Sequence, residues 1–117
     1  MAHYLRFEVY VPVEYKDSKG EHHSIDRDEL RNFANETIQR FRGLTETNPV
    51  QAPPFRGWWK STDIVVDLLI QMFVLVPQRE QDEAVAFFTD WKARLEKQFY
   101  QEFILITFSP LQTIGQL

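Results

Sequence analysis

The chain has 117 residues, with 17 acidic side chains, 13 basic side chains and no cysteine. The lack of cysteine excludes disulfides, cysteine-based metal sites and cysteine nucleophiles. The net charge of −4 argues against duplex nucleic acid as the main partner, because neutralising phosphates requires a basic face. No apolar signal core occurs near the N-terminus, and the longest apolar stretch is shorter than the roughly 20 residues that a membrane span needs. We therefore expect one soluble, cytoplasmic domain covering residues 1–117.

The chain opens with a predicted strand. Every second residue from Leu5 to Val13 is apolar, and alternation with period two is typical of a strand that buries one face. Pro12 has no backbone N–H and should mark the end of this strand. The polar residues 16–21 then predict a loop or a hairpin-like excursion.

A first helix is predicted to follow. Asp26 can be its N-cap, and Glu29 completes a capping box three residues later. Apolar residues recur at helical spacing from Leu30 to Phe41. Gly43 is expected to adopt the left-handed conformation that ends many helices.

Two strands are predicted in the middle of the chain. Residues 45–54 contain three prolines and are predicted to be irregular. A short strand is predicted at residues 55–60. The longest strand is predicted at residues 64–76, where apolar residues occupy one face, and Pro77 ends it.

A second helix and a last strand complete the pattern. Residues 80–100 carry aromatic and aliphatic side chains at helical spacing, and acidic residues near the start suit the positive end of a helix dipole. Residues 103–108 are apolar on both faces and predict a strand, with Ser109 and Pro110 stopping it. The tail through Leu117 is either a short added strand or a loose end.

The element order is therefore strand, helix, strand, strand, helix, strand. Both strand–helix–strand crossovers should be right-handed, which places the two helices on the same face of one sheet. The sequence predicts a two-layer α+β sandwich of the ferredoxin-like βαββαβ type. Its four-stranded antiparallel sheet has the first and third strands at the centre.

The sheet face without helices is predicted to be only partly polar. An exposed sheet face should be mostly polar, and contiguous apolar patches usually mark an interface. We therefore expect a symmetric homodimer packed sheet to sheet. The alternative is that the C-terminal tail covers this face within one chain. The residues expected in the dimer interface are Tyr10, Val65, Leu69, Phe73 and Leu75.

A candidate ligand site surrounds the proline-containing loop. Arginine and lysine beside aromatic faces can bind a small anionic or planar ligand. The alternative is a loop anchored by packed tryptophans, with the arginines capping a helix end. The residues of this candidate site are Arg42, Thr45, Arg56, Trp58, Trp59 and Lys60.

The sequence contains no recognisable catalytic or metal-binding motif. His22 and His23 are adjacent, so in an extended chain they point to opposite sides, and no carboxylate stands at a metal-ligand spacing from them. Glu8, Tyr10 and Asp67 could form an acid–base group on the helix-free face, although charge pairing across strands is the simpler interpretation. We therefore expect neither a metal nor a cofactor.

Three segments carry a resemblance to a known group. They are residues 40–45 (Arg-Phe-Arg-Gly-Leu-Thr), 57–59 (Gly-Trp-Trp) and 101–106 (Gln-Glu-Phe-Ile-Leu-Ile). In these segments the chain resembles a loose group of small, uncharacterised bacterial ferredoxin-like proteins, in which a glycine is usual at the position of Arg42. The resemblance implies the fold and no activity. In topology alone the chain also resembles the dimeric α+β barrel superfamily, some members of which are monooxygenases or haem-handling enzymes.

These observations favour a non-enzymatic, dimeric binding or regulatory module, because the fold signature is complete and a catalytic constellation is missing. Two other functions stay open. One is a monooxygenase-like or haem-handling enzyme with a cavity between sheet and helices. The other is an adaptor whose tryptophan-rich loop docks another protein.

Overall fold

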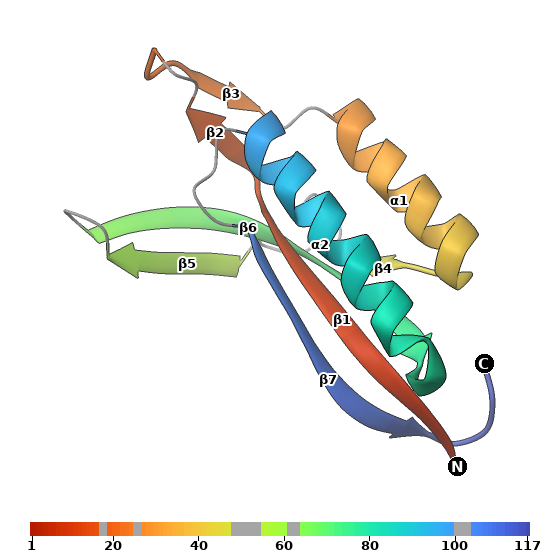
Figure 1. Ribbon diagram of the computed structural model, residues 1–117. Coiled ribbons are helices and arrows are strands. Elements are labelled where there is room, and N and C mark those ends of the chain that lie inside the picture. Colours follow the sequence, from red (N-terminus) through yellow and green to blue (C-terminus); the bar gives the residue numbers. More distant parts are fainter. Residues whose placement is uncertain (17–18, 25–26, 48–54, 61–63, 100–103) are drawn as a thin grey trace.

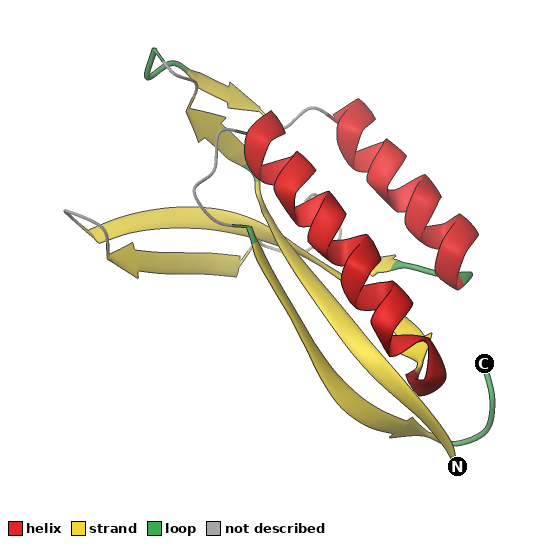
Figure 2. Cartoon of the chain, viewed as in Figure 1, coloured by secondary structure: helices red, strands yellow, loops and turns green. Residues whose placement is uncertain are grey.

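Strand β1 (Ala2–Pro12) lies in an antiparallel sheet between β6 (Ile64–Pro77) and β7 (Leu105–Thr113). The computed structural model describes residues 1–16, 19–24, 27–47, 55–60, 64–99 and 104–117, and of residues 15, 27, 55–60 and 64–68 it describes the backbone only. Within these ranges the chain is an α+β protein, and two helices cover one side of the sheet (Figure 1, Figure 2).

The remaining elements, in chain order, are β2 (Glu14–Lys16), β3 (His22–Ser24), α1 (Arg27–Phe41), β4 (Thr45–Glu46), β5 (Phe55–Lys60), the 3₁₀ helix η1 (Gln78–Glu80) and α2 (Gln81–Gln98). The sheet has the order β4–β6–β1–β7, and β5 pairs with β6 on the side away from β1. All of these pairs are antiparallel. The expected antiparallel sheet with two helices is therefore confirmed. The predicted excursion at residues 16–21 is a hairpin of β2 and β3, which projects from one end of the sheet (Figure 1).

The predicted alternation in β1 is confirmed. Apolar side chains at odd positions from Leu5 to Val11 are almost completely buried, because this face lies beneath the helices. Residues at even positions face the other side of the sheet. The strand begins at Ala2, earlier than predicted, and ends at Pro12 as expected.

Helix α1 ends in a different way from the prediction. It begins at Arg27, and the predicted N-cap Asp26 lies outside the described residues. The residue in the left-handed region is Arg42, with a φ of 73°, whereas Gly43 has no positive φ. The N–H of Arg42 donates to the carbonyl oxygen of Ile38 at 2.7 Å, so the last helical turn closes one residue before the glycine.

Aromatic rings fill the layer between the sheet and the helices. Phe7 of β1 stacks on Phe88 of α2, with 4.7 Å between the ring centroids. Phe88 in turn stacks on Phe41 of α1 at 5.7 Å, and Phe33 meets Trp91 edge to face at 5.2 Å. Both helices thus contribute rings to one cluster with β1, and that cluster is the core of the molecule.

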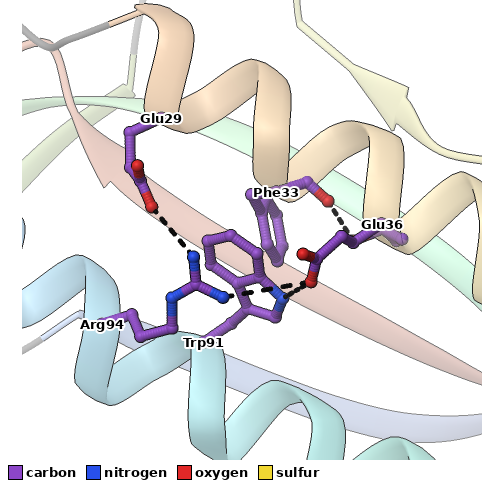
Figure 3. A network of polar contacts seen from close by, with 6 residues as sticks. Glu29, Phe33, Glu36, Trp91 and Arg94 are labelled. Atoms are coloured by element: carbon purple, nitrogen blue, oxygen red, sulfur yellow. Dashed lines mark hydrogen bonds and ion pairs between the residues drawn. The ribbon is translucent and has the colours of Figure 1, made fainter.

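A polar network at the surface ties α1 to α2 (Figure 3). The indole N–H of Trp91 donates to Glu36 Oε2 at 3.0 Å. The Arg94 guanidinium lies 3.7 Å from the centroid of the Trp91 ring and donates to Glu29 Oε1 at 3.4 Å. Exposed ion pairs of this kind contribute little by themselves, so we assign the network a role in orienting the buried Trp91.

Strand β4 corrects the prediction that residues 45–54 are irregular. Thr45 and Glu46 pair with Phe73 and Met72 of β6. Both residues precede the first proline of the segment, so their backbone N–H groups are available to the sheet. Residues 48–54 lie outside the described residues.

Strand β7 corrects the prediction that Ser109 and Pro110 stop the last strand. It continues to Thr113, and Pro110 lies opposite Leu5 of β1. A proline is tolerated in a strand at the edge of a sheet, where the missing N–H faces away from the neighbouring strand. Phe103, the predicted start, lies outside the described residues.

The tail after β7 contacts the beginning of β1. The hydroxyl of Tyr4 donates to Gln116 Oε1 at 3.3 Å, and the backbone N–H of Leu117 donates to the same hydroxyl at 3.0 Å. The tail therefore lies against Tyr4, which is buried.

Candidate functional site

The candidate site lies on the helix-free face of the sheet, where even-numbered residues of β1 meet odd-numbered residues of β6. The register places Glu8 opposite Phe73, and Tyr10 opposite Gln71. Arg6 lies opposite Leu75 of β6. The sheet thus gathers charged, aromatic and apolar side chains on one surface, because neighbours across strands share a face.

Four of these side chains form a continuous polar cluster, which we call the Glu8 cluster: Arg6, Glu8, Tyr10 and Gln71. Arg6 Nε donates to Glu8 Oε1 at 2.7 Å, and the Tyr10 hydroxyl donates to Glu8 Oε2 at 2.8 Å. Gln71 Nε2 donates to the Tyr10 hydroxyl oxygen at 3.1 Å. Each oxygen of the Glu8 carboxylate therefore accepts one hydrogen bond from a neighbouring residue of β1.

The backbone of the loop after β4 extends this cluster. Thr47 Oγ1 accepts a hydrogen bond from the backbone N–H of Gln71 at 3.3 Å, and the Thr47 N–H donates to the Gln71 carbonyl oxygen at 3.0 Å. Gln71 is thus held on both sides, by Thr47 through its backbone and by Tyr10 through its side chain.

The two ionisable groups at the centre have shifted pKa values in opposite senses. The hydrogen bond from Tyr10 lowers the pKa of Glu8, burial acts against it, and Arg6 lowers it further. Burial raises the pKa of Tyr10, and the neighbouring Glu8 carboxylate adds to that effect. At neutral pH Glu8 is therefore ionised and Tyr10 carries its proton.

Hydrogen bonds orient the Glu8 carboxylate, because Arg6 donates to one of its oxygens and Tyr10 to the other. Its lowered pKa makes it a weaker base than an ordinary carboxylate. The Tyr10 hydroxyl likewise has a donor and an acceptor partner. The cluster is a fixed polar surface whose members are held by one another.

Apolar side chains surround the Glu8 cluster. The Arg6 guanidinium lies 3.8 Å from the centroid of the Phe73 ring, a cation–π contact. Leu75 is half-buried, and Leu69 is only 8% exposed. The face is therefore apolar in part, as expected, but Arg6 covers part of the Phe73 ring.

The structure places the residues expected in the dimer interface as follows. Tyr10, Leu69, Phe73 and Leu75 share the helix-free face by register. Val65 lies in β6 opposite Trp59, but its side chain lies outside what the structure describes.

The sequence analysis did not identify Gln71 and Thr47 as members of the site, although the polar Gln71 interrupts an apolar run.

The residues of the candidate ligand site are only partly described. Arg42 and Thr45 are both exposed, and Thr45 lies beside Phe73 at the border of the helix-free face. The other four, Arg56, Trp58, Trp59 and Lys60, lie in β5, which pairs with residues 64–69 of β6, and their side chains are outside the described part of the chain. The sheet thus brings β5 and Thr45 to the same edge, along β6.

The other residues considered for a metal or acid–base site do not join the Glu8 cluster in the described structure. His22 and His23 are exposed in β3, and His3 is exposed at the start of β1. Among the residues that the structure describes, no three histidine, aspartate or glutamate side chains are arranged to hold a metal ion. The Asp67 side chain of the proposed acid–base group lies outside the described residues.

Two sequence comparisons found no match. No protein-family model matches the sequence, and no curated protein is significantly similar to it.

None of the helices in the described part of the chain is both long and apolar enough to cross a membrane.

Proposed function

We propose that the chain is a ferredoxin-like binding or regulatory module without catalytic activity, and that it works as a homodimer with the helix-free faces packed together. The observation that carries this proposal is the Glu8 cluster, a hydrogen-bonded polar group set beside Phe73 and Leu75 on an open sheet face. A face that combines fixed polar groups with apolar side chains has the composition of a protein interface.

The strand order β4–β6–β1–β7, with β5 beside β6 and two helices on one face, supports the ferredoxin-like assignment. In that fold the helix-free face is the broad surface left for a partner. The two helices bury the opposite face of the sheet. On the helix-free face Tyr4 and Leu69 are already buried within the chain, so the partly exposed surface is the part around the Glu8 cluster, Phe73 and Leu75.

The energetics favour a contact of moderate strength. Burying a large apolar side chain contributes about 1.5–3 kcal/mol. Phe73 and Leu75 are already half-buried in one chain, so each would contribute roughly half of that on association. The polar cluster keeps its hydrogen bonds within the chain when the face is covered, but the partly exposed Arg6 and Glu8 lose water, and that desolvation offsets part of the apolar gain.

We further propose that the module binds a small anionic or planar ligand where β5 borders this face. The support is the sequence of β5, which contains Arg56, Trp58, Trp59 and Lys60, together with the position of Thr45 along the same edge. Arginine and aromatic side chains together recognise anions and flat rings. Native mass spectrometry of the purified protein would report such a ligand directly.

The assembly is tested by Phe73→Glu. A carboxylate in the centre of the proposed interface would be desolvated on packing, so this variant should form smaller assemblies than the wild type in light scattering. Ile38→Glu is the matched control, because Ile38 is 42% exposed on α1 and lies away from the sheet face. A folded Phe73→Glu protein with the wild-type number of subunits would rule out this interface.

A further inference from the structure

The outer edge of β7 is the side of this strand that faces away from β1. Among the described strands, β7 pairs only with β1, so no strand in the described part of the chain pairs with its other side. Open edges attract other strands, and proteins usually protect them with charged side chains, prolines or covering segments. The protection of this edge is therefore informative.

The edge carries almost none of the usual protection. No charged side chain occurs from Ile104 to Leu117, although the chain as a whole has a net charge of −4. Strand β5 on the opposite side of the sheet contains Arg56 and Lys60. Pro110 is the one protective residue within β7.

Phe108 is the exposed large apolar side chain of β7 in the described structure. Three other exposed apolar residues, Met1, Ile114 and Leu117, lie at or beyond the end of the β1–β7 pairing, where the tail turns toward Tyr4 of β1 (Figure 1). The Phe108 side chain is 47% exposed while its ring stacks on the buried Phe7 at 4.9 Å. The core aromatic stack therefore reaches the surface at this edge.

An open apolar pocket of about 110 Å³ lies beside Phe108, between α2 and the sheet. It is lined by Phe7, Val85, Phe88, Thr89, Lys92, Ile106 and Phe108. Ile106 and Phe108 are on the helix-covered face, because they lie opposite Val9 and Phe7. A strand added to the edge of β7 would bring its own side chains over the mouth of this pocket.

The position of Pro110 indicates which backbone groups of β7 can pair with an added strand. A proline within a strand turns its nitrogen away from the strand it pairs with, here β1. Alternate residues of a strand direct their backbone N–H and C=O groups to the same side, so Ile106 and Phe108 direct theirs to the outer edge of β7 as Pro110 does. Ile106 and Phe108 retain their N–H groups, so the pairing-competent part of the edge lies on the N-terminal side of Pro110.

We propose that this edge pairs antiparallel with β7 of a second copy of the chain, around a two-fold axis near Thr107. In that pairing Ile106 of one copy and Phe108 of the other exchange backbone hydrogen bonds, and each Phe108 covers the pocket of its partner. A second copy fits because identical antiparallel strands are self-complementary. The uncharged edge also adds no local repulsion between two acidic chains. The contact is independent of the helix-free face.

The test is native mass spectrometry of four proteins: wild type, Phe108→Glu, Phe73→Glu and the control Ile38→Glu. Two independent two-fold contacts predict an assembly larger than a dimer for the wild type and for Ile38→Glu, a closed tetramer where the two axes cross at right angles. Phe108→Glu should leave dimers, because each introduced carboxylate would be desolvated opposite Ile106 of the second copy, over the apolar pocket. Combining Phe108→Glu with Phe73→Glu should give monomers.

The two contacts fail in distinguishable ways. A folded Phe108→Glu protein with the wild-type number of subunits overturns the edge contact, whatever Phe73→Glu does. A wild-type dimer that Phe108→Glu splits, and that Phe73→Glu leaves intact, supports the edge contact and removes the contact through the helix-free face.

Amide hydrogen exchange gives a result that needs no variant, in case Phe108→Glu unfolds through loss of its stacking on Phe7. The N–H groups of Ile106 and Phe108 should be protected in the wild type and should lose protection on dilution to the monomer. Rapid exchange of both amides at concentrations where the protein is assembled would overturn the proposal, since edge amides are protected only by pairing.

Discussion

Glu8 shows how much of the site a single strand determines. Arg6, Glu8 and Tyr10 are two residues apart along β1, and alternate residues of a strand share a face. Their shared face was therefore predictable from the sequence, although charge pairing was expected across strands and the observed contacts run along β1. Gln71 and Thr47 complete the cluster from other segments, and the sequence alone does not contain the register that brings them there.

The pKa of Glu8 predicts a pH dependence of stability. Its pKa in the folded chain is lowered, with the Tyr10 hydrogen bond as the main favourable cause and burial opposing it. A lowered pKa in the folded state contributes stability above the unfolded value of about 4.3, and this contribution is lost as the pH falls through the folded pKa. Wild-type stability should therefore fall below about pH 4.3 more steeply than that of Glu8→Gln.

Urea unfolding at neutral and at acid pH measures this difference. Glu46→Gln serves as the control, because Glu46 is exposed on β4 and makes no contact with the Glu8 cluster in the described structure; it should keep the wild-type pH profile. Parallel profiles for wild type and Glu8→Gln would show that the cluster does not hold the Glu8 carboxylate in its charged form.

At the scale of elements, patterns within one segment predicted the long strands and both helices, whereas the end of β7 and the short strand β4 depend on pairing across the sheet. The period-two strand β1 and the apolar stripe of α1 were predicted from their own residues. The end of β7 was not, because Pro110 stops a strand only where its N–H is needed, and its place at an edge is a property of the whole sheet. Strand β4 was missed because its pairing with β6 is decided across the sheet.

The end of α1 gives a prediction about stability. Arg42 has a φ of 73°, and a residue with a Cβ atom pays roughly 1–2 kcal/mol in the left-handed region. Arg42→Gly should therefore stabilise the chain by about 1 kcal/mol, reduced from that range because glycine also gains entropy in the unfolded state. The measurement is the urea midpoint of the purified variant.

Gly43→Ala is the matched control for this helix end. Gly43 has no positive φ, and an added Cβ would meet no heavy atom within 4 Å. The alanine should therefore leave stability unchanged or raise it slightly. A destabilised Arg42→Gly protein would mean that the Arg42 side chain contributes more than its backbone strain costs.

For the whole molecule, the sequence predicted the α+β class and the antiparallel sheet with two helices, because two long alternating segments and two apolar helical stripes admit few arrangements. The functional site was less predictable. The helix-free face was identified from alternation in β1 and β6, whereas the exposed edge of β7 went unnoticed because the strand was expected to stop at Ser109.

Two surfaces of this molecule are thus proposed to meet a second copy: the helix-free face around the Glu8 cluster and the open edge of β7. Contacts through the two surfaces are compatible, since one lies across the sheet and the other continues it sideways. The contact through the helix-free face is the central claim, because the proposed function depends on it.

Thiol labelling tests this claim most directly, because the chain contains no cysteine and a single introduced thiol reports one position. In Leu75→Cys the thiol lies on the helix-free face, beside Arg6. It should react slowly with a maleimide at concentrations where the protein is assembled. In the double variant that also carries Phe73→Glu, the thiol should react several-fold faster. Equal labelling rates in the two backgrounds would show that no second chain covers this face.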